Sequence, residues 1–210
     1  RVSSSAASDV YKRQVSVHWR LKAYLAFLYI CFFTSSVLSH EINIDGKLDD
    51  SAWKSADEYT KYYESLPFTL NEPKDFQKVL ILEDEKGIYL GFINKQDKET
   101  IRANRHERDD EMANADKAGL AIDFDGDGLA AYAFTVSAGG SIADGIYRNE
   151  NEVNYDWDAD WKSGVFIDQD YWYAEMFMPW SIAPMKAVNG DFREVKLSFW
   201  RLMAAEWRVN

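Results

Sequence analysis

Two tryptophans and two aspartates share one short segment of the chain. Trp157 and Trp161 flank Asp158 and Asp160 in the sequence WDADW. Sugars present C–H faces that stack on aromatic rings, and carboxylates accept hydrogen bonds from sugar hydroxyls, so this combination could bind a saccharide. Residues four positions apart fall on one side of a strand or of a helical turn. The alternative is that both rings belong to the core, where most tryptophans are buried.

A second acidic segment has the spacing of a calcium loop. Asp123, Asp125 and Asp127 precede Gly128 in the pattern D-x-D-x-D-G, which can wrap carboxylates around Ca²⁺. An EF-hand is excluded because its last ligand would be a glutamate at the position of Phe134, and because the flanks read as strands. Two interpretations stay open: a glycine-rich hairpin turn without metal, or a loop between strands that binds a structural calcium ion.

Charged residues also gather between two predicted strands. Arg105, Arg108, Asp109 and Asp110 lie in the sequence RHERDDE. Taken alone, this pattern indicates an exposed loop of ion pairs. His106 lies within the same run, and we expect it to be solvated and not to bind a metal.

No catalytic constellation is recognisable in the sequence. Glycoside hydrolysis needs two carboxylates across a cleft, one of them with a raised pKa. The chain after residue 39 has 34 acidic residues, so pairs such as Asp158 and Asp160 arise by chance. Glu175 alternates with apolar neighbours in a predicted strand, and we expect its side chain to face solvent. The sequence has no Ser/His/Asp elbow, HExxH, CxxC, GxGxxG or phosphate-binding loop, and we predict that it is not an enzyme.

The net charge of −11 combines two unlike parts of the 210-residue chain, +4 over the first 39 residues and −15 over the rest. An acidic domain argues against nucleic-acid binding, which needs a basic surface. Arg20 and Lys22 precede the apolar run YLAFLYICFF, and small residues suited to a cleavage site follow it. This order is typical of a cleaved signal peptide over residues 15–39. The apolar run is shorter than the roughly 20 residues that span a bilayer. Residues 1–14 are polar and aperiodic, and resemble a translated cloning or sequencing adapter.

Residues 40–210 have the pattern of a single all-β domain. Apolar, β-branched and aromatic runs are separated by turn residues about every 8–12 positions. We predict a two-sheet antiparallel β-sandwich, jelly-roll or immunoglobulin-like, without disulfides because the only cysteine, Cys31, lies in the leader. The predicted strands are 79–82, 88–93, 118–124, 129–136, 145–148, 163–167, 171–178 and 195–202, with short helical turns at 50–56 and 180–185.

Seven segments, taken in order, carry a family resemblance. They are IDGKLDDSAW, LNEP, LEDEKGIYLGF, RHERDDE, AIDFDGDGLAAYAFTVSAGG, WDADW and YAEMFMPW, within about residues 42–208. In this order they resemble carbohydrate-binding module family 9, in the version that precedes a large C-terminal β-barrel-like region in bacterial exported proteins. The resemblance implies a sugar site on this domain, a sugar-binding arginine at Arg105 or Arg108, and structural calcium. It also implies that the chain is truncated before a C-terminal β-barrel region.

These observations predict a non-catalytic carbohydrate-binding module of a secreted or envelope protein that binds polysaccharide or oligosaccharide, in the context of polysaccharide breakdown. The alternative is a structural or periplasmic domain that serves an attached outer-membrane β-barrel and binds no sugar. We expect a periplasmic, outer-membrane-associated or extracellular location and no transmembrane helix in the mature chain. The candidate sugar-binding residues are Trp157, Trp161, Arg105, Arg108 and Asp158, and the candidate calcium ligands are Asp123, Asp125 and Asp127.

Overall fold

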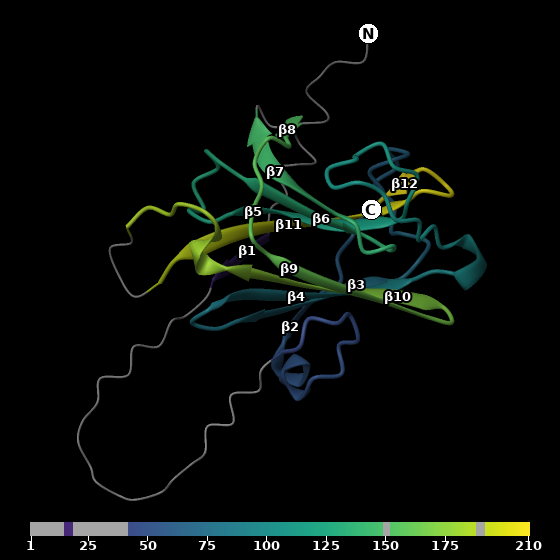
Figure 1. Cartoon of the computed structure of the whole chain (residues 1–210), viewed down its shortest axis with the longest axis horizontal. Helices are drawn as coiled ribbons and strands as arrows, with labels where there is room; N and C mark the ends of the chain where they lie inside the picture. The colour runs from purple at the N-terminus through teal and green to yellow at the C-terminus, as the bar shows by residue number, and fades with distance from the viewer. Residues whose placement is uncertain (1–14, 19–41, 149–151, 188–191) are drawn as a thin grey trace, which may run out of the picture.

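Two antiparallel β-sheets lie face to face in the computed structural model, which describes residues 15–18, 42–148, 152–187 and 192–210 (Figure 1). Helical structure in these residues is limited to the 3₁₀ turns η1 (Ser51–Ser55), η2 (Lys98–Thr100) and η3 (Trp180–Ile182). Within the same residues, no helix has the length and apolar character needed to cross a membrane. The two-sheet sandwich predicted from the alternating pattern is confirmed.

The larger sheet has seven strands in the order β1-β11-β5-β6-β7-β8, with β12 paired to the end of β11. At its centre β5 pairs on one side with β6 and on the other with β11, near the end of the chain. Every residue of β5 is buried, as expected for a central strand. The strands are β1 (Val15–His18), β5 (Lys117–Asp123), β6 (Tyr132–Ser137), β7 (Ile142–Arg148), β8 (Glu152–Asn154), β11 (Glu194–Met203) and β12 (Arg208–Val209).

The smaller sheet has five strands in the order β2-β3-β4-β10-β9. Strands β3 and β4 are consecutive in the chain and form a hairpin. Strand β10 pairs with β4 on one side and with β9 on the other. The strands are β2 (Asp57–Tyr59), β3 (Gln77–Glu83), β4 (Gly87–Lys95), β9 (Lys162–Asp168) and β10 (Tyr171–Pro179).

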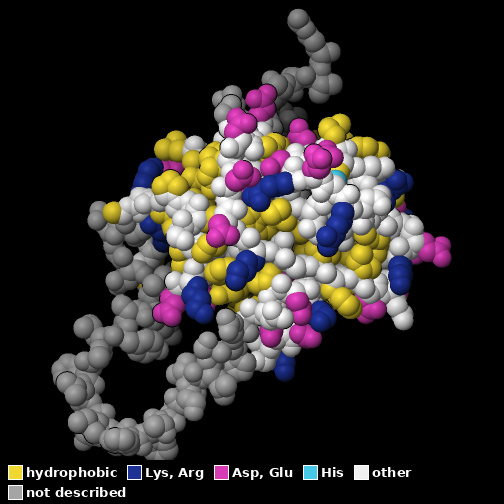
Figure 2. Space-filling view, in the orientation of Figure 1, with side chains coloured by type: hydrophobic (Ala, Val, Ile, Leu, Met, Phe, Trp, Pro, Cys, Tyr) yellow, Lys and Arg dark blue, Asp and Glu magenta, His cyan; other side chains and the backbone are white. Residues whose placement is uncertain are grey.

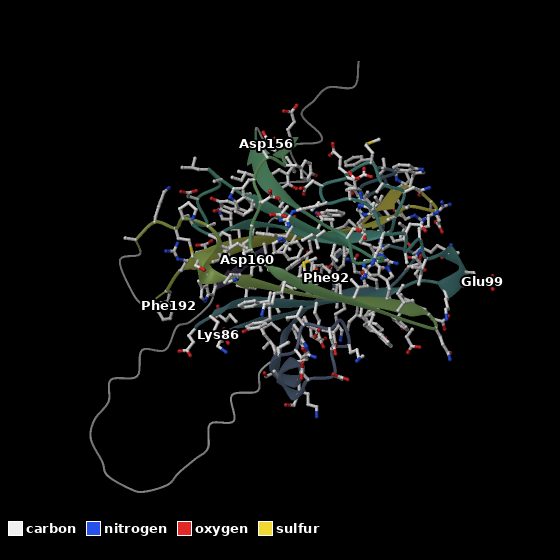
Figure 3. The ribbon with its side chains drawn as sticks, in the orientation of Figure 1. Lys86, Phe92, Glu99, Asp156, Asp160 and Phe192 are labelled. Atoms are coloured by element: carbon white, nitrogen blue, oxygen red, sulfur yellow. The ribbon has the colours of Figure 1, made fainter. Side chains whose placement is uncertain are left out.

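The main hydrophobic core lies between the two sheets. Because side chains alternate along a strand, every second residue of each strand points into this layer. From β10 these are Trp172, Ala174, Met176 and Met178, all fully buried, and they share one cluster with Phe134 of β6. Phe92 of β4 is seen between the layers in Figure 3. This layer positions every loop considered below.

A second, smaller cluster covers the outer face of the five-stranded sheet. Trp53, from η1, packs on Leu80 and Tyr89, whose side chains point away from the main core. Residues 42–56 run across this face, and they approach so closely that a Cβ on Gly91 would lie 2.4 Å from a methyl group of Leu48. The segment with the sequence IDGKLDDSAW is therefore a covering layer of the sheet.

Glu175 of β10 holds this covering layer in place. Its Oε2 accepts hydrogen bonds from the backbone N–H groups of Asp45 and Gly46 at 2.8 and 2.7 Å, and its Oε1 accepts one from the indole N–H of Trp53 at 2.9 Å. The expectation that Glu175 faces solvent is wrong, since only 1% of the residue is exposed. Burial raises the pKa of the Glu175 carboxyl, and these three hydrogen bonds act in the opposite direction.

All eight predicted strands and both predicted helical turns are present, with ends within about three residues of the prediction. The unpredicted strands β2, β8 and β12 have only two or three residues, too few to show an alternating pattern. The predicted adapter, 1–14, lies outside the described residues. So does most of the predicted signal peptide, of which only Val15–His18 is described, as strand β1 beside β11.

Candidate functional site

Trp157 and Trp161 lie on the segment between β8 and β9, but their surroundings differ. Trp161 is a core residue with 7% exposure, and its ring meets Phe134 edge-on with 5.4 Å between the ring centroids. Trp157 is half-buried, and its ring centroid lies 5.0 Å from that of Tyr132 and 6.1 Å from that of Phe134. Of the two indoles, Trp157 is the one that keeps part of its ring available to a ligand.

Arg108 joins the loop before β5 to this tryptophan segment. Its Nη2 donates to Oδ1 of Asp144 in β7 at 2.5 Å and to the carbonyl oxygen of Ala159 at 3.3 Å. Its Nε lies 2.8 Å from Oδ1 of Asp158, and the side chains of Arg108 and Asp158 are 37% and 70% exposed. The structure therefore brings Arg108 and Asp158 together at the surface. Asp158 lies on the segment that also carries Trp157.

Asp144 is the buried anchor of this cluster, a role that sequence reasoning did not assign to it. Its Oδ2 accepts a hydrogen bond from the N–H of Ala159 at 2.6 Å, and its own N–H donates to Oδ1 of Asp109 at 3.0 Å. Burial raises the pKa of the Asp144 carboxyl, while the Ala159 N–H and the charge of Arg108 favour its ionised form. The signal available in the sequence was an aspartate inside the apolar strand pattern IADGIY.

Arg105 and His106 lie on the same loop as Arg108. Arg105 is exposed, whereas His106 is half-buried. The N–H of His106 donates to Oγ of Ser141 at 2.9 Å, and that hydroxyl donates back to the carbonyl oxygen of His106 at 2.8 Å. The backbone around His106 thus fastens the loop to the turn between β6 and β7 and so holds Arg108 in position.

The turn between β5 and β6 uses its three aspartates in contacts with the protein. Asp123 accepts hydrogen bonds from three backbone N–H groups of the turn, at 2.7 to 3.1 Å. Asp125 pairs with Arg193 at 2.7 Å, and Asp127 pairs with Lys186. No three Asp, Glu, His or Cys side chains among the described residues are grouped to hold a metal ion. The turn as it stands does not fit a calcium site, and calcium there stays a prediction.

Chelation tests whether calcium binds at this turn. We expect the melting temperature to be the same in EDTA and in millimolar calcium, because cations from the protein already neutralise Asp125 and Asp127. Differential scanning calorimetry measures both conditions. A calcium-dependent rise in melting temperature that is lost in Asp123→Asn would show instead that metal displaces Lys186 and Arg193.

A cleft that the sequence analysis did not identify opens beside the start of β3, with a volume of about 300 Å³. Tyr63 and Phe76, 45% and 46% exposed, supply aromatic surface, and Glu72 and Asp75 supply carboxylates. We call it the Phe76 cleft. Its lining residues are Thr60, Lys61, Tyr62, Tyr63, Glu72, Pro73, Asp75, Phe76 and Gln77.

The loop that joins the two lining segments of the Phe76 cleft, residues 64–71, is held at both ends. The N–H of Glu64 donates to the carbonyl oxygen of Asn71 at 2.9 Å, which closes residues 64–71 on themselves. The N–H of Val209 in β12 donates to the carbonyl oxygen of Leu66 at 3.0 Å, and Arg208 forms an ion pair with Glu64 at 3.3 Å. The geometry of the cleft therefore depends on the last strand of the described chain.

Buried polar side chains at this end of the sandwich leave hydrogen-bonding groups unpaired. Gln77 lies opposite Asn94 in the β3–β4 pair, and neither amide has a hydrogen-bond partner within the described protein; nor does the hydroxyl of Tyr62. Arg201 of β11 is fully buried and donates through Nη2 to Oε1 of Gln96 at 2.7 Å, while its Nε and Nη1 are unpaired. Burial lowers the pKa of Arg201 to about 10. Gln77, Asn94 and Arg201 belong to three different strands, so no sequence motif identifies them.

The surface in Figure 2 carries charges of both signs. Lysine and arginine side chains are interspersed with acidic ones on this face, and hydrophobic side chains lie between them. A ligand recognised here would therefore meet mixed donors, acceptors and apolar surface.

Two solved structures resemble this arrangement of sheets. A carbohydrate binding module family 9 domain from Caldicellulosiruptor kristjanssonii in complex with cellotriose has a TM-score of 0.55 and 13% identity, over 80% of this chain and 77% of that one. A family 9 module from the same organism in complex with glucose has a TM-score of 0.54 and 12% identity, over 77% of this chain and 74% of that one. The chain has the fold of carbohydrate-binding module family 9.

The expected family 9 fold is thus confirmed by structure. A scan with protein-family models gives no match, and a search of curated proteins gives none either. We call the group formed by Arg108, Asp144 and Asp158 the Arg108 cluster. Within this family 9 fold, the Arg108 cluster involves the seven-stranded sheet, whereas the Phe76 cleft begins at β3 of the five-stranded sheet.

Proposed function

We propose that this domain is a non-catalytic carbohydrate-binding module of an exported protein that takes part in polysaccharide breakdown. The observation that carries the proposal is the meeting of Arg108 and Asp158 beside Trp157, on a fold shared with modules solved in complex with cellotriose and glucose. A partly exposed indole offers a face to sugar C–H groups, and the charged pair offers donors and acceptors to hydroxyls.

Asp144 supports this role by fixing the guanidinium of Arg108 before any ligand arrives. Preorganised groups bind more tightly because less freedom is lost on binding. Asp158 is the exposed half of the pair, since most of its side chain is in solvent. A sugar hydroxyl can therefore replace or bridge the contact between Arg108 and Asp158 without disturbing the buried contact to Asp144.

The positions of the buried carboxylates support a role without catalysis. Glu175, whose raised pKa would suit a general acid, lies beneath residues 42–56 and is committed to three donors. Asp144 is likewise enclosed and committed to Arg108 and Ala159. Both carboxyl groups are buried, at 1% exposure or less, whereas glycoside hydrolysis needs two carboxyl groups that face the scissile bond from either side.

Binding to soluble glycans tests the proposed function. We expect affinity electrophoresis on β-glucan and xylan gels to retard the wild-type chain, and calorimetric titration with cellotriose to show binding. Trp157→Ala should weaken binding at its site about tenfold, because one aromatic contact contributes roughly 1 kcal/mol or more.

The matched control for Trp157→Ala is Phe192→Ala. Phe192 is an aromatic residue with 51% exposure, and it lies at the far left edge of the molecule in Figure 3. Its removal should leave glycan binding unchanged. A folded wild-type chain that binds none of these glycans would contradict the proposal and would favour a structural domain without a sugar ligand.

A further inference from the structure

We propose that the Phe76 cleft is a second saccharide site, selective for neutral sugar rings. The inference rests on the proposed carbohydrate-binding function and adds to it a site and a substrate class. It uses residues of the loop before β3, none of which belongs to the Arg108 cluster.

Exposed apolar side chains concentrate around this cleft. Large exposed hydrophobic residues scattered singly are ordinary, but a cluster of them marks a binding surface. Six of the ten such residues in the described chain lie in this corner, five before β3 and one on the turn between β11 and β12: Tyr63, Leu66, Phe68, Leu70, Phe76 and Trp207. Tyr63 and Phe76 stand at the two ends of the loop and both line the cleft, which suits the C–H face of a sugar ring.

The polar lining of the Phe76 cleft selects against acidic ligands. Glu72 and Asp75 place two carboxylates in the lining, against one amine from Lys61. Asp75 also lines an adjoining hollow of about 200 Å³, where Asp97 and Glu206 outnumber the one amine of Lys74. Carboxylates accept hydrogen bonds from sugar hydroxyls and repel uronic acids, so a neutral saccharide is the matching ligand.

Unpaired groups in two lining residues of the Phe76 cleft are enclosed by the protein and would suit an occupant rich in hydroxyl groups once their side chains rotate toward the cleft. Gln77 and Tyr62 line the cleft and are more than nine-tenths buried, and the amide of Gln77 and the hydroxyl of Tyr62 make no hydrogen bond within the described residues. Buried polar groups are nearly always paired, with protein, with water or with ligand. A hydroxyl can act as donor and acceptor at once, which matches an amide that presents both kinds of atom.

The structure favours a sugar over a protein partner for this cleft. The hollow is small and mixes two carboxylates with two rings, whereas the core of a protein interface is depleted of charge. The ties from residues 64–71 to β12 hold the walls in place without a partner.

Calorimetry and NMR on the full chain test the proposal, with cellotriose as neutral probe and trigalacturonate as acidic probe. We expect cellotriose to bind and to shift the side-chain amide signals of Gln77, and trigalacturonate to do neither. Phe76→Ala should weaken cellotriose binding at this site about tenfold without lowering the melting temperature, since Phe76 is half exposed. Phe192→Ala, which removes an equally exposed ring from the far end of the sandwich, should change nothing.

A double variant separates this site from the Trp157 surface. We expect Trp157→Ala to retain cellotriose binding that disappears when Phe76→Ala is added. If the wild-type chain binds cellotriose and Phe76→Ala binds it equally well, the Phe76 cleft proposal is overturned while the proposed function stands. If the wild-type chain binds no sugar, both fail. A wild-type dimer that Phe76→Ala dissociates, with no effect on sugar binding, would identify the cleft as a protein interface instead.

Discussion

Replacing Glu175 by alanine is expected to lower the free energy of unfolding by about 3–5 kcal/mol. The substitution removes the acceptor shared by the backbone N–H groups of Asp45 and Gly46 and the indole N–H of Trp53. Those donors stay enclosed between the sheet and its covering layer, where water does not replace the lost carboxylate. Residues 42–56 then lose their attachment to β10.

Urea denaturation followed by tryptophan fluorescence measures this loss. The matched control is Glu58→Ala, because Glu58 is an exposed glutamate whose side chain forms an ion pair with Lys78 at the surface. Its removal should change stability by less than about 1 kcal/mol. A Glu175→Ala chain as stable as the Glu58→Ala chain would show that the covering layer is held by hydrophobic contacts alone.

The raised pKa of Glu175 adds a pH dependence with a definite sign. Between the ordinary glutamate pKa of 4.5 and the raised value, the folded chain holds a proton that the unfolded chain has released. The contribution of Glu175 to stability is therefore largest below pH 4.5 and falls as the pH rises through the raised pKa. The stability advantage of the wild-type chain over Glu175→Gln should decline in that direction.

The second large effect is expected at Asp144, where alanine should cost about 2–4 kcal/mol. The substitution leaves the N–H of Ala159 without its acceptor and leaves Arg108 paired with the exposed Asp158 and, at 3.7 Å, with Asp109. Beyond the global loss, the loop that carries Arg108 should open more often. Hydrogen exchange at residues 105–111 measures that opening directly.

Asp160→Ala is the control for Asp144→Ala. Asp160 is an exposed aspartate of the same tryptophan segment and is labelled in Figure 3. Its removal should leave both stability and exchange at residues 105–111 unchanged. Faster exchange in both variants would mean that the loop responds to net charge and not to the Asp144–Arg108 contact.

The alternating pattern predicts the strands well because burial on one face of a sheet imposes it locally. It does not say what covers the other face. Glu175 was expected in solvent for this reason: its position in the pattern is right, but residues 42–56, distant in sequence, enclose it. The residues next to Glu175 in the sequence cannot show that residues 42–56, from the beginning of the domain, cover it.

The candidate site shows the same limit. Trp157 and Trp161 are the same residue type in one short segment, yet Phe134 and its neighbours in β6 cover one ring more fully than the other. Arg108 and Asp158 were both candidate sugar-binding residues from the sequence, and the structure brings their side chains into contact. Their role in sugar binding stays a prediction. The Phe76 cleft was missed because its lining comes from two segments on either side of residues 64–71, and β12, at the far end of the described chain, ties that loop down.

The strand order has a consequence for how the chain acquires its shape. Both sheets are joined at their centres by residues distant along the chain, Leu90 with Met176 and Leu120 with Phe199. Domains dominated by such long-range pairings fold in milliseconds to seconds, because loop closure must precede any gain in contacts. Until β10 and β11 arrive, the edges of β4 and β5 lie open to wrong partners. A chain that ends before residue 194 would keep the β5 edge uncovered, and we expect it to aggregate.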